Sequence, residues 1–198
     1  MSDSPPVSSA NKTFPCIIFD TETTGLPPWH RNPAKIADWN GCRLVQLAWM
    51  VIDPAGAEQS HYEALVTPVG FTIPEKAAAI HGITTENALA NGRPLEEVLG
   101  AFAAVLDRFP NAPLVAHNLE FDLAILTTEA MRMEMSHLIA LLGRPQKHCT
   151  MLTGTKKGKK WPKLVELYRE YFGCEPEGTA HNALWDVRTC AAIYRRQI

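Results

Sequence analysis

Two acidic side chains at the end of an apolar run are the first candidates for chemistry. The segment Phe14–Asp20 is short, apolar and rich in branched residues, which predicts a buried strand. Asp20 ends this segment, and Glu22 lies two residues further on. Residues two apart on a strand point to the same side, so both carboxylates should face one point in space. Two like charges there repel each other unless a cation lies between them, and hard oxygen ligands suit Mg²⁺ or Mn²⁺. An ordinary solvated strand end is the alternative.

Two further acidic residues lie at the starts of predicted helices. Asp122 falls in the first turn after the short strand Pro113–His117, where a helix N-terminus favours negative charge; compensation of the helix dipole alone would also explain it. Asp186 lies five residues after His181, and on one ideal helix their side chains would diverge by about 140°. We therefore expect His181 in the loop before the helix, reaching over a site that Asp186 helps to ligate. A surface histidine and an ordinary helical aspartate are the alternative.

The elements that would position these residues predict one mixed α/β sheet with helices packed on its faces. Asp53–Gly56 supplies a turn, so the strands on either side of it should form an antiparallel hairpin. Asn118 can cap the helix that follows it, and Gly25–Gly41 has no helical or strand period and should be a long loop. Strands are expected at Phe14–Asp20, Arg43–Asp53, His61–Val66, Pro113–His117 and His148–Met151, and helices at Pro94–Phe109, Leu119–Leu142, Pro162–Phe172 and Asn182–Gln197.

The composition excludes several classes of protein. A length of 198 residues suits one domain, and 46% hydrophobic residues are too many for a disordered chain. No apolar run approaches the roughly 18 residues of a membrane-spanning helix, and Met1–Thr13 lacks the apolar core of a secretory signal, so it is expected to be a flexible lead-in. A net charge of −2 argues against a generally basic binder of nucleic acid, although a local basic patch stays open. Five scattered cysteines without a Cys-x-x-Cys pair predict a cytoplasmic protein with neither a disulfide framework nor a zinc site.

The acidic motifs in combination are far more specific than any one of them. Asp-Thr-Glu-Thr-Thr-Gly-Leu at 20–26, then Asp122 between a strand and a helix, then His-Asn-Ala-Leu-Trp-Asp at 181–186, resembles the three-motif order of the DEDDh 3′–5′ exonucleases. This is the DnaQ-like family, which includes the proofreading ε-type subunit of bacterial DNA polymerase III and ribonuclease T. The segment Ala79–Thr84, and Asn118 with Phe121 and Asp122, match as well. The resemblance implies a ribonuclease H-like domain from residue 14 to 198, with a mixed five-stranded sheet flanked by helices.

The resemblance also implies a mechanism. In that family four acidic residues hold two divalent ions, normally Mg²⁺ or Mn²⁺. Carried over, Asp20 would bridge both ions, Glu22 and Asp186 would complete the tighter site, and Asp122 would act mostly through water. One ion lowers the pKa of a water and the other steadies the departing 3′ oxygen. His181 would be the general base, because an unperturbed imidazole pKa of about 6.5 allows proton uptake near neutral pH. The product would be a nucleoside 5′-monophosphate released from a 3′ end.

Substrate contacts follow from the same resemblance. The terminal nucleotide should lie in the turn after the first strand, with backbone amides near its 3′-OH and a leucine beside its base: Thr23, Thr24, Gly25 and Leu26. Three residues are candidates for substrate contact that capping, loop ordering and core packing, respectively, would also explain: Asn118, His81 and Phe121. Four lysines within five residues predict either a phosphate-gripping arm or a solvated loop: Lys156, Lys157, Lys159 and Lys160.

The chain departs from the family pattern in the loop Pro27–Gly41, which is longer than the short turn of most members. It carries Trp29, His30, Arg31 and Trp39, with Arg43 beside it. The loop restricts the site to single strands, contacts a partner, or covers the sheet edge; the sequence does not rank these three.

The leading hypothesis is a metal-dependent 3′–5′ exonuclease acting on the 3′ ends of single-stranded nucleic acid, with DNA favoured. The alternatives are an exoribonuclease of the ribonuclease T or oligoribonuclease kind, since no motif reports a 2′-OH, and a non-catalytic nucleic-acid-binding accessory module. Only twelve residues follow Asp186, so the C-terminal tether of the replicative proofreading subunit is not expected. A polymerase or another nucleic-acid-processing protein that docks by a surface stays open as a partner, and no membrane contact is expected.

Overall fold

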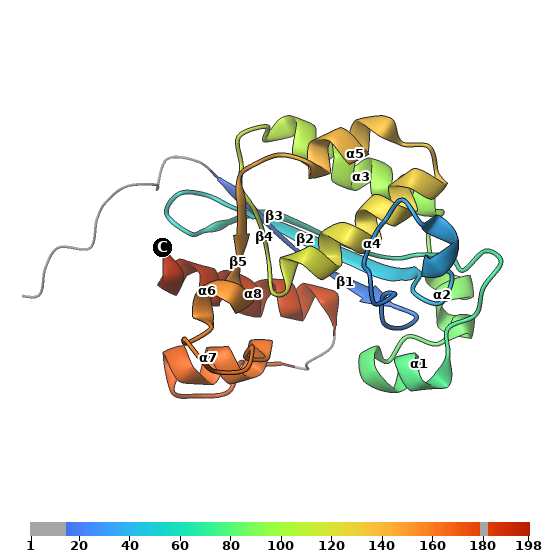
Figure 1. Cartoon of the computed structure of the whole chain (residues 1–198). Coiled ribbons are helices and arrows are strands. Elements are labelled where there is room, and N and C mark those ends of the chain that lie inside the picture. Colours follow the sequence, from blue (N-terminus) through green and yellow to red (C-terminus); the bar gives the residue numbers. More distant parts are fainter. Residues whose placement is uncertain (1–14, 179–181) are drawn as a thin grey trace, which may run out of the picture.

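A five-stranded mixed sheet forms the centre of the computed structural model, which describes residues 15–178 and 182–198 (Figure 1). The strand order is β3-β2-β1-β4-β5. β1, β2 and β3 pair antiparallel, whereas β4 lies parallel to β1 and β5 parallel to β4. The strands span Cys16–Thr23 (β1), Leu44–Ile52 (β2), Glu58–Leu65 (β3), Leu114–Ala116 (β4) and Lys147–Cys149 (β5). The predicted mixed sheet and the predicted hairpin are confirmed.

Helices cover both faces of this sheet (Figure 1). α8 contacts β1 and β2, and α6 and α7 pack against α8. α4 lies on the opposite face with α5 and α3. The helices span Glu75–His81 (α1), Thr85–Asn91 (α2), Leu95–Arg108 (α3), Leu119–Arg132 (α4), Ser136–Leu142 (α5), Thr150–Gly154 (α6), Leu164–Phe172 (α7) and Ala183–Gln197 (α8), with a 3₁₀ helix at Ile36–Trp39 (η1).

Burial on both faces explains the apolar composition of β1. Ile17 and Phe19 pack with the α3 and α4 side of the core, whereas Cys16 and Ile18 pack against α8. A strand covered on both sides reads as a nearly continuous apolar run because neither face meets water. The alternation then continues past the apolar part. It directs Asp20 to the α8 side and Thr21 to the α4 side.

The helix expected at Leu119–Leu142 is in fact two helices. α4 ends at Arg132, α5 begins at Ser136, and the break contains Glu134 with φ of 56°. The backbone N–H of Met135 donates to the carbonyl of Ala130, five residues back, so the α-helical ladder is interrupted. The apolar period continues across the break because both helices pack on the same core, which is why the sequence pattern did not reveal it.

Three other expectations are corrected in detail. The loop Gly25–Gly41 contains η1, and α1, α2 and α6 occur where no helix was predicted, because each has only five to seven residues. The last strand ends at Cys149, and Thr150 already begins α6. The segment 1–13 that was predicted to be flexible, and His181, lie outside the described residues. Within the part of the chain that is described, no helix is long and apolar enough to cross a membrane.

Candidate active site

Three of the predicted acidic residues converge at the end of β1. Asp20, Glu22 and Asp186 each offer a carboxylate oxygen, and these oxygens all lie within 4.8 Å of one another. Asp20 and Glu22 come from alternate positions of β1, and Asp186 comes from the first turn of α8, which contacts β1. The two-residue alternation along β1 and the position of Asp186 in the first turn of α8 therefore account for the cluster.

Asp122 reaches the same strand from the opposite face of the sheet. It lies in the first turn of α4 and is only 2% exposed. Its Oδ1 accepts hydrogen bonds from the backbone N–H of Thr21 at 3.1 Å and from the Thr21 hydroxyl at 2.7 Å. Asp122 is therefore fixed to the one residue that separates Asp20 from Glu22.

The electrostatics of the cluster oppose ionisation of all four carboxyls. Burial, then the charges of Asp122, Asp186 and Glu22, raises the pKa of Asp20 well above its usual range. Burial, then Asp186 and Asp122, raises the pKa of Glu22 to about 8. Burial also raises the pKa of Asp122 to about 7, although the two hydrogen bonds from Thr21 act in the opposite direction. Ionisation of these carboxyls together is therefore unfavourable unless positive charge lies among them.

The donor set fits a hard divalent cation. Asp20, Glu22 and Asp186 present only carboxylate oxygens, which Mg²⁺ and Mn²⁺ prefer, with no thiolate or imidazole in the described cluster. Closely placed carboxylates that are costly to ionise together become favourable ligands when a dication supplies the compensating charge. Asp20, Glu22 and Asp186 are thus the residues that could hold a metal, with Asp122 behind the strand.

A polar network that the sequence analysis missed supports Asp186. Gln46 lies opposite Glu22 in the β1–β2 register, and its side chain donates to Glu63 Oε1 at 2.8 Å and accepts from the N–H of Ala183 at 3.2 Å. Asn182 donates to the same Glu63 oxygen at 2.7 Å. We call these three side chains the Gln46–Glu63–Asn182 network. Asn182 as a helix-capping residue was the available sequence signal.

The turn after β1 has a fixed shape. The hydroxyl of Thr23 donates to the carbonyl of Gly25 at 2.8 Å, and the hydroxyl of Thr24 donates to Gly41 at 3.1 Å. A Cβ at Gly25 would lie 2.8 Å from the carbonyl oxygen of Gly41, so only glycine fits. Leu26 is 89% exposed beside this turn. The four residues expected to receive a terminal nucleotide therefore lie next to the carboxylate cluster.

Two of the three weaker substrate candidates have structural roles that account for them. His81 is buried, and its Nδ1 accepts from the N–H of Ile83 at 3.1 Å, which orders the following loop. Phe121 is half-buried against the core on the α4 side. Asn118 occupies the N-cap position of α4, but its φ is 70° and its side chain makes no capping hydrogen bond, so the capping expectation is wrong.

The four lysines of the segment 156–160 differ in their ion pairs. Lys156 pairs with Glu170, and Lys160 pairs with Glu166 at 3.1 Å, both on α7. Lys157 and Lys159 are exposed and make no ion pair with any residue in 15–178 or 182–198. Two of the four positive charges are thus neutralised within the chain, and two are available to a polyanion.

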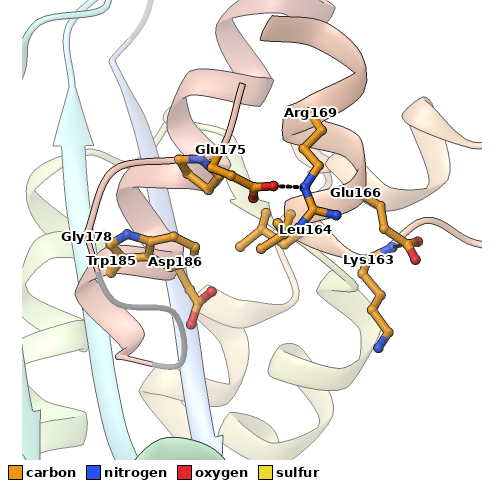
Figure 2. Close-up of a pocket in the computed structure, with 10 residues that line it drawn as sticks. Lys163, Leu164, Glu166, Arg169, Glu175, Gly178, Trp185 and Asp186 are labelled. Carbon is orange, nitrogen blue, oxygen red and sulfur yellow. Dashed lines mark hydrogen bonds and ion pairs between the residues drawn. The ribbon is translucent and has the colours of Figure 1, made fainter. Parts of the chain in front are cut away.

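A cavity of about 640 Å³ opens beside Asp186, between α7, the segment 173–178 and the first turn of α8 (Figure 2). Figure 2 shows the Asp186 carboxylate on its wall and the ion pair between Arg169 and Glu175 across it. Lys163 and Glu166 lie on the α7 side. The lining of the cavity that Asp186 shares therefore carries charges of both signs.

The mixed sheet, the helices on both of its faces and the acidic cluster at the end of its central strand define an α/β protein with a candidate site for a divalent metal. The family of exonucleases described as RNase T matches residues 17–194, and the chain belongs to this family. The resemblance to DnaQ-like exonucleases and the ribonuclease H-like fold are thereby confirmed.

Individual relatives are similar over most of this chain but are themselves longer. A DNA polymerase III subunit epsilon-like protein of Rhodobacter capsulatus is 28% identical over 91% of this chain and 23% of its own length. Exonuclease DPD1, chloroplastic/mitochondrial, of Arabidopsis thaliana is 28% identical over 94% of this chain and 57% of its own. E. coli exonuclease I in complex with a dT13 oligonucleotide superposes with a TM-score of 0.71 and 19% identity, over 92% of this chain and 40% of that one. The chain thus spans between 23% and 57% of the length of these proteins.

Proposed function

We propose that this protein is a metal-dependent 3′–5′ exonuclease that hydrolyses phosphodiester bonds from the 3′ end of single-stranded DNA and releases nucleoside 5′-monophosphates. The observation that carries the proposal is the approach of Asp20, Glu22 and Asp186 within 4.8 Å, beside a turn that can receive a chain end. Membership of an exonuclease family supports the reaction class, and the dT13 complex of a protein with the same fold supports single-stranded DNA.

The roles of the chain's own residues follow from their positions. Asp20, Glu22 and Asp186 would hold Mg²⁺ or Mn²⁺, and Asp122, which also binds Thr21, would act on the ions mostly through water. When bound, two such ions supply a water of lowered pKa and charge stabilisation for the departing 3′ oxygen. His181, directly before Asn182 in the sequence, takes the proton of the attacking water.

The turn Thr23–Leu26 gives the reaction its direction in this proposal. Its backbone amides bind the 3′-OH of the terminal nucleotide, and the exposed Leu26 contacts the terminal base. The hydrogen bond from Thr23 to Gly25 closes this turn, and the bond from Thr24 ties it to Gly41. A chain end without a further phosphate fits such a closed turn. An internal position of a strand would have to continue through that turn, so cleavage should begin at the 3′ end.

One experiment separates this proposal from its alternatives. Single-stranded DNA, duplex DNA and RNA, each labelled at the 5′ end, are incubated with the protein in Mg²⁺ and in EDTA. We expect a ladder that shortens from the 3′ end of single-stranded DNA in Mg²⁺ only. Preference for RNA would favour the exoribonuclease, and binding without cleavage would favour the non-catalytic module.

Two variants complete the test. Asp20→Asn should abolish cleavage, whereas Glu96→Gln, an exposed acidic residue on α3, should leave it unchanged. His181→Ala should lower the rate by about 100-fold or more while metal binding persists. Cleavage that survives both EDTA and Asp20→Asn would contradict the two-metal assignment, and near-normal turnover of His181→Ala would remove that residue from the role of base.

A further inference from the structure

The long loop Pro27–Gly41 presents one tryptophan almost entirely to solvent. Trp29 is 93% exposed, the highest exposure among the large hydrophobic side chains in the described part of the chain. Isolated exposed apolar residues need no explanation, but Trp29 lies only three residues after Leu26, which is 89% exposed. Both side chains lie on the same short segment that leaves the carboxylate site.

The backbone that carries Trp29 is held in a defined conformation. The N–H of Arg31 donates to the carbonyl of Pro28 at 2.9 Å, which closes a turn with Trp29 and His30 at its tip. His30 is fixed by Asp38 at 2.9 Å and accepts from the N–H of Asn32 at 2.9 Å. Its ring meets the indole of Trp29 at 71° with centroids 5.6 Å apart. The turn and the contact with the His30 ring therefore hold Trp29 in place, while most of its indole surface stays exposed to solvent.

The rest of the loop is anchored to the protein core. Trp39 is fully buried, and its Nε1 donates to the carbonyl of Asn32 at 3.0 Å. Arg132 of α4 donates to the carbonyl of Ile36 at 2.9 Å. The loop's two ends meet where Thr24 binds Gly41. An insertion built in this way fixes the position of its tip, and ordered loops of this kind are frequently functional.

The position of the tip relative to the site follows from chain geometry. Trp29 lies four positions after Gly25, so their Cα atoms lie at most about 14 Å apart. A stacked strand rises about 3.4 Å per nucleotide, so a base a few nucleotides from the 3′ end lies within reach. The loop also carries Arg31 and Lys35, neither of which forms an ion pair within the described residues, whereas Asp38 is paired with His30. The net charge around the tip thus favours a polyanion.

We infer that Trp29 is a stacking site for a nucleobase of the single strand upstream of the terminal nucleotide. Every base offers a π face, so an exposed indole binds single strands without regard to sequence. In duplex nucleic acid that face is covered by neighbouring bases, and the site therefore selects for unpaired ends. The inference rests on the proposed exonuclease function and extends it from the terminal nucleotide to the strand behind it.

The test compares a long and a short substrate. Wild type, Trp29→Ala, Trp29→Phe and Trp29→Leu are assayed in Mg²⁺ on an oligothymidylate of about twelve nucleotides and on the p-nitrophenyl ester of thymidine 5′-monophosphate, which has no upstream base. Trp29→Ala and Trp29→Leu should raise KM for the oligonucleotide by about 5- to 150-fold, the range expected for loss of one stacked base. Trp29→Phe should retain most of the affinity, and all four proteins should hydrolyse the ester equally. Leu89→Ala, another exposed apolar residue, is the surface control.

A scan with abasic nucleotides identifies the base. An abasic position that abolishes the difference between wild type and Trp29→Ala marks the nucleotide that stacks. Two results would overturn the inference in a wild type that cleaves both substrates: an unchanged KM in Trp29→Ala, or equal KM values in Trp29→Leu and Trp29→Phe. The first result would leave contact with a protein partner as the remaining role for Trp29. A wild type that cleaves neither substrate would contradict the proposed function itself.

Discussion

The side-chain amide of Asn182 donates a 2.7 Å hydrogen bond to Glu63, and this bond joins the residue before α8 to the edge strand β3. The same Glu63 oxygen accepts from Gln46, whose own oxygen accepts from Ala183. Asn182 also caps α8 by accepting from the N–H of Trp185 at 3.1 Å. The start of the helix that carries Asp186 is thus attached to β2 and β3 by side chains that bind no metal themselves.

This attachment predicts that metal affinity and nuclease activity depend on Glu63, although Glu63 itself binds no metal. Glu63→Ala removes the acceptor shared by Gln46 and Asn182, and outer hydrogen-bond partners of metal ligands typically contribute about 10- to 100-fold in metal affinity or activity. Glu63→Gln keeps an oxygen that accepts both bonds and should restore activity. The measurement is the nuclease rate as a function of Mn²⁺ concentration.

An acidic residue away from this network provides the matched control for Glu63. Glu96→Ala, at an exposed position on α3, should behave as wild type. A Glu63→Gln variant as impaired as Glu63→Ala would show that the charge, and not the hydrogen-bond geometry, is what the site requires.

The carboxylate cluster predicts that metal binding stabilises the fold. Without a cation, Asp20, Glu22 and Asp186 are close like charges that burial penalises further. Asp20→Asn removes one of them, so its melting temperature in EDTA should exceed that of wild type. Each kcal/mol of stabilisation corresponds to about 2–4 °C for a chain of this size. Mn²⁺ should raise the melting temperature of wild type, and much less that of Asp20→Asn.

Thermal melts in EDTA and in Mn²⁺ measure both effects. Glu96→Gln, which also removes one negative charge but lies on α3, should respond to Mn²⁺ as wild type does. Equal Mn²⁺ shifts in all three proteins would place the ion outside the cluster.

Much of the site could be predicted because it depends on short-range periodicity. The two-residue alternation of β1 places Asp20 and Glu22 on the same side of the strand. Because α8 begins directly after Asn182, Asp186 lies in the first turn of that helix. The mixed sheet follows similarly from the order of apolar runs. These features need only local information, which the sequence carries directly.

The features that could not be predicted depend on contacts between distant segments. The bonds from Thr21 to Asp122 span 101 positions, and that from Asn182 to Glu63 spans 119. The break between α4 and α5 is invisible in the apolar pattern, because both helices pack against one core. Helices α1 and α2 have seven residues each, too few to establish a period.

The lysine segment predicts a split response to salt. Lys157 and Lys159 lack ion pairs among the described residues, whereas Lys156 and Lys160 already bind Glu170 and Glu166. If the segment contacts phosphates, Lys157→Ala with Lys159→Ala should lower the slope of log affinity against log salt by about 1.4, at about 0.7 for each single-strand contact. Lys156→Ala with Lys160→Ala should lower it less.

Binding of labelled single-stranded DNA to Asp20→Asn, across a salt series, measures these slopes without cleavage. Both double variants change the net charge equally, so the comparison isolates position. Identical slopes in Asp20→Asn alone and in both double variants made on it would exclude the segment from nucleic-acid binding.

His117 predicts a dependence of stability on pH. Its ring bridges two segments near α8, with Nδ1 at 3.0 Å from the Thr150 hydroxyl and Nε2 at 3.0 Å from the carbonyl of Pro162. Burial lowers the pKa of His117 below its ordinary value of 6.5, although the bond to Pro162 acts in the opposite direction. The unfolded chain therefore takes up a proton at a higher pH than the folded protein does. The contribution of His117 to the free energy of unfolding is fully present above about pH 6.5, and it is lost as the pH falls toward the lower pKa of the folded protein.

The comparison of wild type with His117→Gln isolates this effect, because the carboxylates titrate alike in both proteins and cancel in the difference. Urea unfolding in EDTA gives the two free energies of unfolding at about pH 7.5 and about pH 5. His117→Gln should be destabilised at the higher pH, and the gap should narrow at the lower pH as wild type loses the contribution of its neutral imidazole. A gap that stays constant between the two pH values would mean that His117 titrates as it does in the unfolded chain.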